Sequence, residues 1–182
     1  MLNKKDRIFN NLYGLKGNGL KTAFALGDWS EAKEIVTKGK DWILKQVKDS
    51  GLRGRGGAGF PSGLKWSFMP PKTEYKPNYL IVNADESEPG TCKDREIIRN
   101  EPFKLLEGIL YASVAMEVHK AYIYIRGEFY NEYLNLQSAI DECYSNNCLW
   151  LLLSSSGYKY VDLFHGRYSC FILSIENNHI KI

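Results

Sequence analysis

Glycine is concentrated in one short segment of this chain, because residues 51–63 hold six of its sixteen glycines. Glycine loses more backbone entropy on folding than other residues, so a cluster indicates a place where side chains would obstruct something. Successive backbone N–H groups in such a loop can line a concave surface that binds anions. Arg53 and Arg55 lie inside the segment and Lys65 follows it. The segment therefore predicts a cradle for a phosphate-bearing ligand, most simply a nucleotide.

The glycine pattern that begins at Gly54, G-x-G-x-x-G, matches a dinucleotide-binding motif that requires a strand directly before it. The preceding residues 40–49 are charged and have a helical pattern, so a standard dinucleotide-binding turn is not expected. A Walker loop is excluded, because no glycine at the required spacing precedes Lys-Ser or Lys-Thr. A flexible linker is the alternative, but linkers seldom carry bulky residues such as Phe60, Pro61 and Trp66.

A second polar cluster, residues 83–88, reads Asn-Ala-Asp-Glu-Ser-Glu and follows the apolar run 79–82. In open α/β sheets, ligands bind beyond the carboxyl ends of the strands. The three carboxylates could ligate a metal, act as acid or base, or accept hydrogen bonds from ligand N–H and hydroxyl groups. An acidic surface turn that ends at Pro89-Gly90 explains the composition equally well, and the residues alone leave both interpretations open.

Aromatic residues flank the glycine-rich segment at Phe60, Trp66 and Phe68. Their rings could stack on a planar heterocycle, although ordinary packing is the default for any one of them. The three histidines share no motif, and each is expected to have a packing or surface role.

The order of the expected elements indicates how these clusters are positioned. Residues 1–30 have no sustained pattern and are expected to form an irregular arm. Ser30 can cap a helix start, where Glu31 and Glu34 suit the positive end of the dipole, and Gly51 is placed to end a helix as its C′ residue. An alternation of strand and helix is typical of an α/β fold with a parallel sheet. The expected elements are a helix over 41–49, a strand over 79–82, a helix from Pro102 through Val114, a strand over 121–125 and a helix over 128–142.

Composition excludes several classes of protein. The net charge of +3 is too small, and the basic residues too interleaved with acids, for a nucleic-acid-binding stripe. The longest apolar run, 148–153, is far too short to span a membrane, and no secretory signal is visible. The four cysteines show no C-x-x-C spacing, so we expect reduced thiols in a cytosolic compartment.

Two long motifs, residues 51–70 and 79–91, resemble the family of NADH-oxidising flavoprotein subunits of respiratory complex I, the NADH-quinone oxidoreductase of bacteria. Residues 6–14 and 122–128 fit the same family, and the resemblance covers roughly residues 1–142. It implies an incomplete Rossmann-like domain of α/β class, with a parallel sheet, that binds FMN without a covalent bond. NADH would lie against the flavin and pass a hydride to it, and the protein would supply orientation and electrostatics.

The same resemblance implies roles for individual residues. The glycine-rich segment and Lys65 would line the NADH and FMN phosphates, the two phenylalanines would stack near the adenine, and the polar cluster would hold the ribityl and ring atoms of FMN. Glu88 would lie close to nicotinamide and flavin and is the expected catalytic residue. The implied cofactor-binding residues are Gly54, Arg55, Gly56, Gly57, Ala58, Gly59, Phe60, Pro61, Ser62, Gly63, Lys65, Phe68, Asn83, Asp85, Glu86 and Ser87.

The chain departs from the family after residue 142. Family members are longer, and they carry a second flavin-contacting stretch, Gly-Glu-Glu-Thr, which residues 168–174 do not match. They also carry a late cysteine cluster that binds a four-iron, four-sulfur centre. Cys143 and Cys148 lack its spacing, so this chain does not support that centre, and no metal ligands are expected. We therefore expect an arm over 1–40, the FMN/NADH-binding domain over 41–142, and a divergent, poorly ordered tail over 143–182.

A frameshift near residue 143 is one hypothesis for this divergence. Reading the encoding DNA in all three frames tests it, and the absence of Gly-Glu-Glu-Thr from every frame contradicts it.

The resemblance also implies partners and a location. The partners would be other peripheral-arm subunits of complex I, chiefly the small thioredoxin-like iron–sulfur subunit, with no nucleic acid and no direct membrane insertion. The location would be the cytoplasmic side of a bacterial inner membrane, or the matrix side in a mitochondrion. The alternatives are a diaphorase subunit of an NAD-linked hydrogenase or formate dehydrogenase, and a non-catalytic remnant. The sequence leaves the activity of this truncated chain open.

Overall fold

The structure of the chain is a computed structural model that describes residues 3, 7–12, 16–71, 73, 76–149, 161–165, 174–176 and 179–181. Three strands form a parallel sheet in the order β1-β2-β3, and β4 pairs separately with β5 in an antiparallel ladder. The expected α/β class with a parallel sheet is therefore confirmed. The elements are α1 (Leu20–Leu26), α2 (Ala32–Asp49), α3 (Ser62–Ser67), β1 (Asn78–Ala84), α4 (Lys93–Asn100), α5 (Pro102–Ala115), β2 (Val118–Ile125), α6 (Tyr130–Ser145), β3 (Val161–His165), β4 (Ser174–Glu176) and β5 (His179–Lys181).

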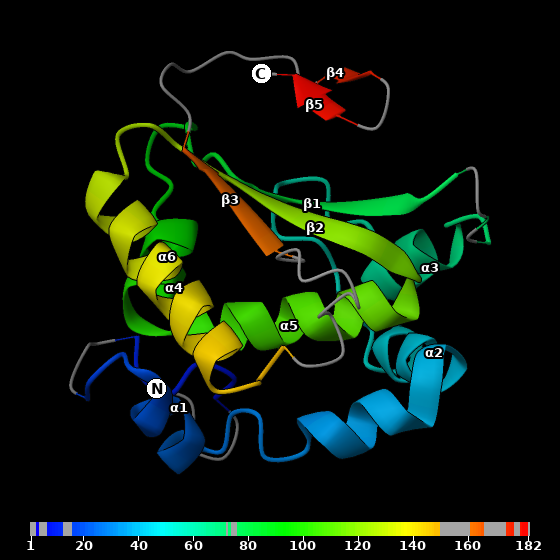
Figure 1. The fold of residues 1–182 in the computed structure, drawn as a ribbon, viewed down its shortest axis with the longest axis horizontal. Coiled ribbons are helices and arrows are strands. Elements are labelled where there is room, and N and C mark those ends of the chain that lie inside the picture. Colours follow the sequence, from blue (N-terminus) through cyan, green and yellow to red (C-terminus); the bar gives the residue numbers. More distant parts are fainter. Residues whose placement is uncertain are drawn as a thin grey trace.

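The sheet packs one face against the helices, which lie together below it in the view of Figure 1. Strand side chains alternate between the two faces of a sheet. Val82 of β1 pairs with Ile123 of β2, which in turn pairs with Leu163 of β3, so all three lie on the same face. The strand residues of the core cluster are Leu80, Val82, Ala84, Ala121, Ile123, Ile125, Val161 and Leu163.

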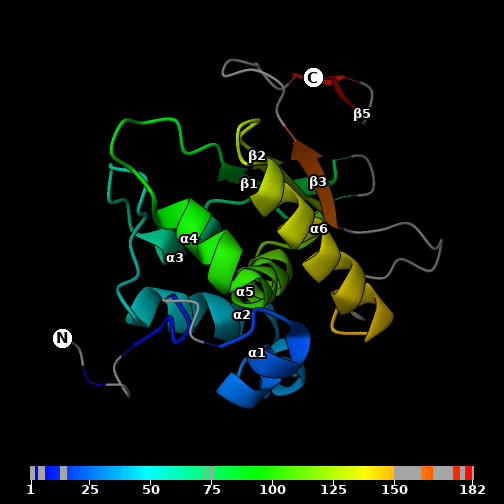
Figure 2. The same cartoon turned by 90° about the vertical axis from the view of Figure 1, so that its left-hand side faces the viewer.

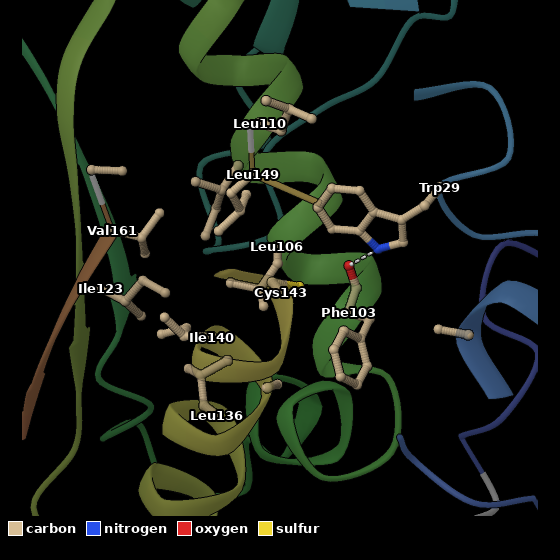
Figure 3. Packing of buried hydrophobic residues seen from close by; sticks show 14 of the residues in the cluster. Trp29, Phe103, Leu106, Leu110, Ile123, Leu136, Ile140, Cys143, Leu149 and Val161 are labelled. Carbon is tan, nitrogen blue, oxygen red and sulfur yellow. Dashed lines mark hydrogen bonds between the residues drawn. The ribbon is translucent and has the colours of Figure 1, made fainter. Parts of the chain in front are cut away.

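Helices α5 and α6 supply most of the large core side chains. Figure 3 shows Leu106 of α5 between the sheet residues Ile123 and Val161 on one side and Trp29 on the other. The indole Nε1 of Trp29 donates a hydrogen bond to the carbonyl of Phe103 at 3.1 Å. The core therefore joins the sheet, α5 and the segment that precedes α2.

The N-terminal segment contains a helix where an irregular arm was expected. Residues 20–26 form α1, and the buried Leu20 and Ala23 lie one turn apart on its inner face. Gly27, in the left-handed conformation at φ +98°, ends the helix and donates its N–H to the carbonyl of Phe24. This part of the prediction is wrong because seven residues give too few turns for a periodic pattern, and packing on the core stabilises the helix.

Helix α2 is longer than expected and is kinked. It begins at Ala32, close to the start indicated by Ser30, but Glu31 is the N-cap and the Ser30 hydroxyl donates to the carbonyl of Gly27 instead. Gly39 has non-helical angles at φ +81°, ψ −178°. Gly51 follows its last turn at φ +66°, which confirms the expected left-handed glycine at C′. No helix within the described parts of the chain has the length and hydropathy needed to cross a membrane.

The second face of the sheet carries aromatic side chains on neighbouring strands. The ring of Tyr122 lies 6.1 Å from that of Tyr79 and 5.5 Å from that of Phe164, measured between centroids. Lys120 forms an ion pair with Asp162 on the same face at 2.6 Å. Cross-strand pairs of this kind stabilise a sheet locally.

Candidate functional site

The glycine-rich segment folds as a narrow loop between α2 and α3. Arg53 and Pro61 form an isolated antiparallel bridge, which the N–H of Gly54 extends by donating to the carbonyl of Phe60 at 2.9 Å. The guanidinium of Arg53 reaches across the loop and donates to the carbonyl of Gly59 at 2.9 Å. The base of the loop is therefore fixed, which contradicts the linker alternative.

The tip of the loop presents unused hydrogen-bond donors. Residues 54–58 are exposed, and Gly57 and Gly59 adopt positive φ angles of +105° and +61°, which favour glycine. The N–H groups of Gly56, Gly57 and Gly59 donate to no other group in the described part of the chain. Arg55 and Lys65 are exposed, and no described carboxylate lies within ion-pair distance of either. The tip therefore has the chemistry of an anion cradle.

Two of the three aromatic residues near the loop remain exposed. The rings of Phe60 and Phe68 lie 6.4 Å apart between centroids at an interplanar angle of 54°. Trp66 is partly buried instead and packs against a small cluster that includes Met116 and Val118. Phe60 and Phe68 are thus available for stacking, and Trp66 serves packing.

The polar cluster forms a connected turn after β1. The amide oxygen of Asn83 accepts the N–H of Asp85 at 2.9 Å, and the Ser87 hydroxyl donates to Asp85 Oδ1 at 2.8 Å. Farther along, the carbonyl of Glu88 accepts the N–H and the hydroxyl of Thr91. Three of the expected residues therefore act as one hydrogen-bonded unit, and the Glu88 side chain is exposed beside it.

Glu86 differs from the other carboxylates because it is buried, with 6% of its surface exposed. Its Oε1 accepts the N–H of Asp94 at 2.9 Å and its Oε2 accepts the N–H of Arg95 at 3.1 Å. These N–H groups belong to the first turn of α4 and have no partner within the helix. The side chain of Glu86 thus ties the polar cluster to α4 while its neighbours remain accessible.

Replacing Glu86 with glutamine should lower the free energy of unfolding by about 1–2 kcal/mol, because the amide offers one acceptor where the carboxylate offers two at a helix N-terminus. Urea denaturation followed by circular dichroism measures the change. Glu88→Gln is the matched control, and a change below about 0.5 kcal/mol is expected there because its side chain is exposed. Equal effects of the two substitutions would contradict the capping role.

Arg126 also belongs to this site, although the sequence does not single it out. It follows β2 directly, and its N–H donates to the carbonyl of Ala84 at 3.3 Å and its Nη1 to the carbonyl of Glu86 at 2.7 Å. Glu128 pairs with it at 2.8 Å, and this hydrogen bond holds the pKa of Glu128 below its ordinary value. The position of Arg126 in the sequence could have revealed this role, because the residue directly follows β2, and β2 pairs with β1 in the parallel sheet.

The two loops emerge on the same side of the domain, where Figure 2 shows the glycine-rich loop in teal and the polar cluster in green. No hydrogen bond or ion pair joins residues 50–68 to residues 83–92, all of which are described. Within the described residues, no group of three histidine, cysteine, aspartate or glutamate side chains could hold a metal ion. The site therefore has two separate walls, one cationic and one acidic.

A separate hollow of about 470 Å³ lies between α5 and the start of α2. It contains none of the residues expected from the sequence. Tyr111 donates its hydroxyl to Glu107 there at 2.5 Å, and burial raises the pKa of both groups. The lining residues are Gly27, Ser30, Glu31, Ile35, Lys104, Glu107, Gly108 and Tyr111.

Comparison with known families gives one match over most of the chain. Residues 47–178 match the family described as the Nuo51 FMN-binding domain. This range contains both loops of the site and extends beyond residue 142, where the resemblance was expected to end. The frameshift hypothesis stays a prediction, to be tested on the encoding DNA.

Curated relatives are similar to this chain over most of its length. An NADH-quinone oxidoreductase F-subunit of Rhizobium meliloti is 60% identical over 82% of this chain and 34% of its own length. The corresponding protein of Rickettsia bellii is 56% identical over 93% of this chain and 41% of its own length. The mitochondrial NADH dehydrogenase [ubiquinone] flavoprotein 1 of Dictyostelium discoideum is 57% identical, with coverages of 93% and 36%. The chain thus spans about a third to two-fifths of the relatives that it matches.

Solved structures share the fold as well. NAD⁺-reducing [NiFe]-hydrogenase in its H₂-reduced state gives a TM-score of 0.60 at 36% identity, over 69% of this chain and 21% of the other. The air-oxidised state gives a TM-score of 0.62 at 33% identity, over 83% of this chain and 25% of the other. The described fold is therefore found in solved NAD⁺-reducing enzymes.

Proposed function

The chain belongs to the Nuo51 FMN-binding domain family of complex I flavoprotein subunits, and from this membership we propose that it binds FMN and NADH for hydride transfer from NADH to FMN. The observation that carries the proposal is the tip of the glycine-rich loop, whose N–H donors and Arg55 have no partner among the described residues. Lys65 follows on α3 and likewise has no described carboxylate within ion-pair distance. Both proposed ligands carry phosphate, and such groups bind where amide dipoles and cations converge. When bound, FMN accepts the hydride of NADH.

The proposed phosphate wall consists of the loop and α3. Arg55 and Lys65 neutralise phosphate charge, and the exposed glycines let phosphate oxygens approach the backbone. Phe60 and Phe68 offer exposed ring faces for the adenine of NADH. The proposed phosphate and adenine contacts comprise Gly54, Arg55, Gly56, Gly57, Ala58, Gly59, Phe60, Pro61, Ser62, Gly63, Lys65 and Phe68.

The polar cluster forms the proposed flavin wall. Asn83, Asp85 and Ser87 already share hydrogen bonds, so they can exchange these for ribityl hydroxyls and ring N–H groups at little cost in side-chain order. Glu86 orients this turn through its bonds to the first turn of α4, and we keep it among the proposed flavin contacts through its backbone. Glu88, exposed beside the turn, is the proposed carboxylate near nicotinamide and flavin.

The proposal extends to assembly. We place the chain in the peripheral arm of complex I, chiefly against the small thioredoxin-like iron–sulfur subunit, on the cytoplasmic face of a bacterial inner membrane or the matrix face in a mitochondrion. We propose that the four-iron, four-sulfur centre of the family is not held by this chain.

FMN binding by the purified chain tests the proposal. We expect FMN fluorescence to be quenched on titration and the visible flavin absorbance to bleach when NADH is added without oxygen. Failure to retain FMN would support the non-catalytic remnant instead. FMN that binds without bleaching would limit the function to nucleotide binding.

The double variant Arg55→Gln/Lys65→Gln should weaken FMN binding by about 10–100-fold, because two charge-assisted contacts to phosphate are lost. Lys21→Gln/Lys33→Gln is the charge-matched control, since Lys21 on α1 and Lys33 on α2 are exposed and lie outside the loops. If the double variant and the control bind FMN with equal affinity, the loop is not part of the FMN site.

A diaphorase subunit of an NAD-linked hydrogenase or formate dehydrogenase is the second candidate, favoured by the fold shared with the NAD⁺-reducing hydrogenase. Identity supports complex I more strongly, at 53–60% against 33–36%. Ferredoxin-like sequences fused to the same reading frame in flanking DNA would mark a diaphorase and separate the two candidates.

A further inference from the structure

Helix α6 ends in a turn that brings two cysteines together. The N–H of Cys148 donates to the carbonyl of Cys143 at 2.9 Å, and the N–H of Asn147 donates to the carbonyl of Tyr144 at 3.2 Å. Asn147 has a left-handed φ of +55°. These features define a Schellman motif, in which the side chain three positions before the helix cap meets the one two positions after it. Those two positions are occupied here by Cys143 and Cys148.

The turn places the side chains of Cys143 and Cys148 next to each other, but the two thiols differ in exposure. Cys143 is fully buried, while Cys148 is partly exposed and both are free thiols. Burial raises the pKa of each thiol. The backbone bond between them also sets a Cα separation of the kind that disulfides bridge, about 4.4–6.8 Å. A small oxidant can therefore reach the thiol of Cys148, and the buried thiol of Cys143 lies next to it.

We propose that Cys143 and Cys148 are a redox-active pair that closes into a disulfide on oxidation by a peroxide. The minor thiolate fraction of Cys148, which grows as the pH rises, attacks one oxygen of hydrogen peroxide, which breaks the O–O bond and leaves a sulfenic acid and hydroxide. The sulfur of Cys143 then attacks the Cys148 sulfur and displaces its oxygen, which leaves as water with the thiol proton. Overall, two thiols and one peroxide give one disulfide and two waters, and a thiol reductant reverses the change.

The disulfide would fix the start of the connection to β3. Leu149 follows Cys148 and is fully buried in the core cluster. Tyr144, within the same turn, accepts the N–H of Val161, the first residue of β3, on its hydroxyl at 2.7 Å. A covalent link across the turn therefore restrains both contacts. Oxidation should slow hydrogen exchange at the amides of residues 147–149.

Mass spectrometry of the full chain tests the proposal. All measurements use a parent chain that carries Cys170→Ser, a substitution outside the described residues. Cys92 is kept because it is an exposed thiol whose oxidation shows that peroxide has reacted. After mild peroxide we expect a Cys143–Cys148 peptide that is lighter by about 2 Da, restored by dithiothreitol. The proposal is overturned if Cys92 is oxidised while both other cysteines stay reduced, or if Cys148 pairs elsewhere.

Two variants in this background separate pairing from folding. With Cys143→Ala, Cys148 has no partner, so its sulfenic acid should persist and be trapped by dimedone. With Cys148→Ser, Cys143 should stay reduced, and the slowing of exchange at residues 147–149 should be lost. Equal dimedone labelling of Cys148 with and without Cys143 would overturn the resolving role of Cys143.

Discussion

Replacing Leu106 with alanine should lower the free energy of unfolding by about 3–4 kcal/mol. Leu106 has none of its surface exposed and lies at the centre of the core, between the sheet and Trp29 (Figure 3). The substitution removes buried methyl groups and leaves a cavity whose walls come from separate elements, which cannot all collapse into it. Urea denaturation, followed by circular dichroism and by tryptophan fluorescence, measures the loss.

Leu134→Ala is the matched control for this prediction. The side chain of Leu134 on α6 is 47% exposed, so the same chemical change should cost less than about 0.5 kcal/mol. A cost near 1 kcal/mol or less for Leu106→Ala would mean that α5 does not pack against the sheet as described. The difference between the two variants measures burial at α5 directly.

The central helices and strands could be predicted because their own residues carry the pattern. Pro102 fits the first turn of a helix, and the apolar residues that follow recur at helical spacing, so α5 was expected from residue 102 onward. Helix α1 could not be predicted in this way, since Leu20 and Ala23 are its only buried residues. Its stability comes from contacts with the core, which no short stretch of sequence displays.

The residue types of the candidate site could be predicted more readily than the tasks of individual residues. Asp85, Glu86 and Glu88 are equivalent as carboxylates in the sequence, yet only Glu86 turns inward and bonds the first turn of α4. That choice depends on the backbone path between β1 and α4. The role of Arg126 could not be predicted for a related reason, since its place beside Glu86 arises from the pairing of β1 with β2.

Replacing Gly63 with alanine should lower the free energy of unfolding by about 2–3 kcal/mol. A Cβ atom at this position would lie 2.6 Å from the backbone nitrogen of Lys48 and 2.9 Å from its Cα. These atoms belong to the last turn of α2 and cannot move aside as a flexible side chain would. The two helices must therefore separate, and chemical denaturation should report the loss.

Gly56→Ala is the control that separates packing from ligand binding. A Cβ atom there meets nothing within 4 Å, so stability should change by no more than about 1 kcal/mol, in the favourable direction. Gly56 nevertheless lies at the tip of the proposed phosphate cradle, where a methyl group would obstruct the approach of FMN to the backbone. We therefore expect Gly56→Ala to keep its stability and lose FMN affinity, and Gly63→Ala to lose stability before any ligand is added. If Gly63→Ala is as stable as the parent chain, α3 does not pack on α2 as described, and the loop between them has no fixed base from which to bind phosphate.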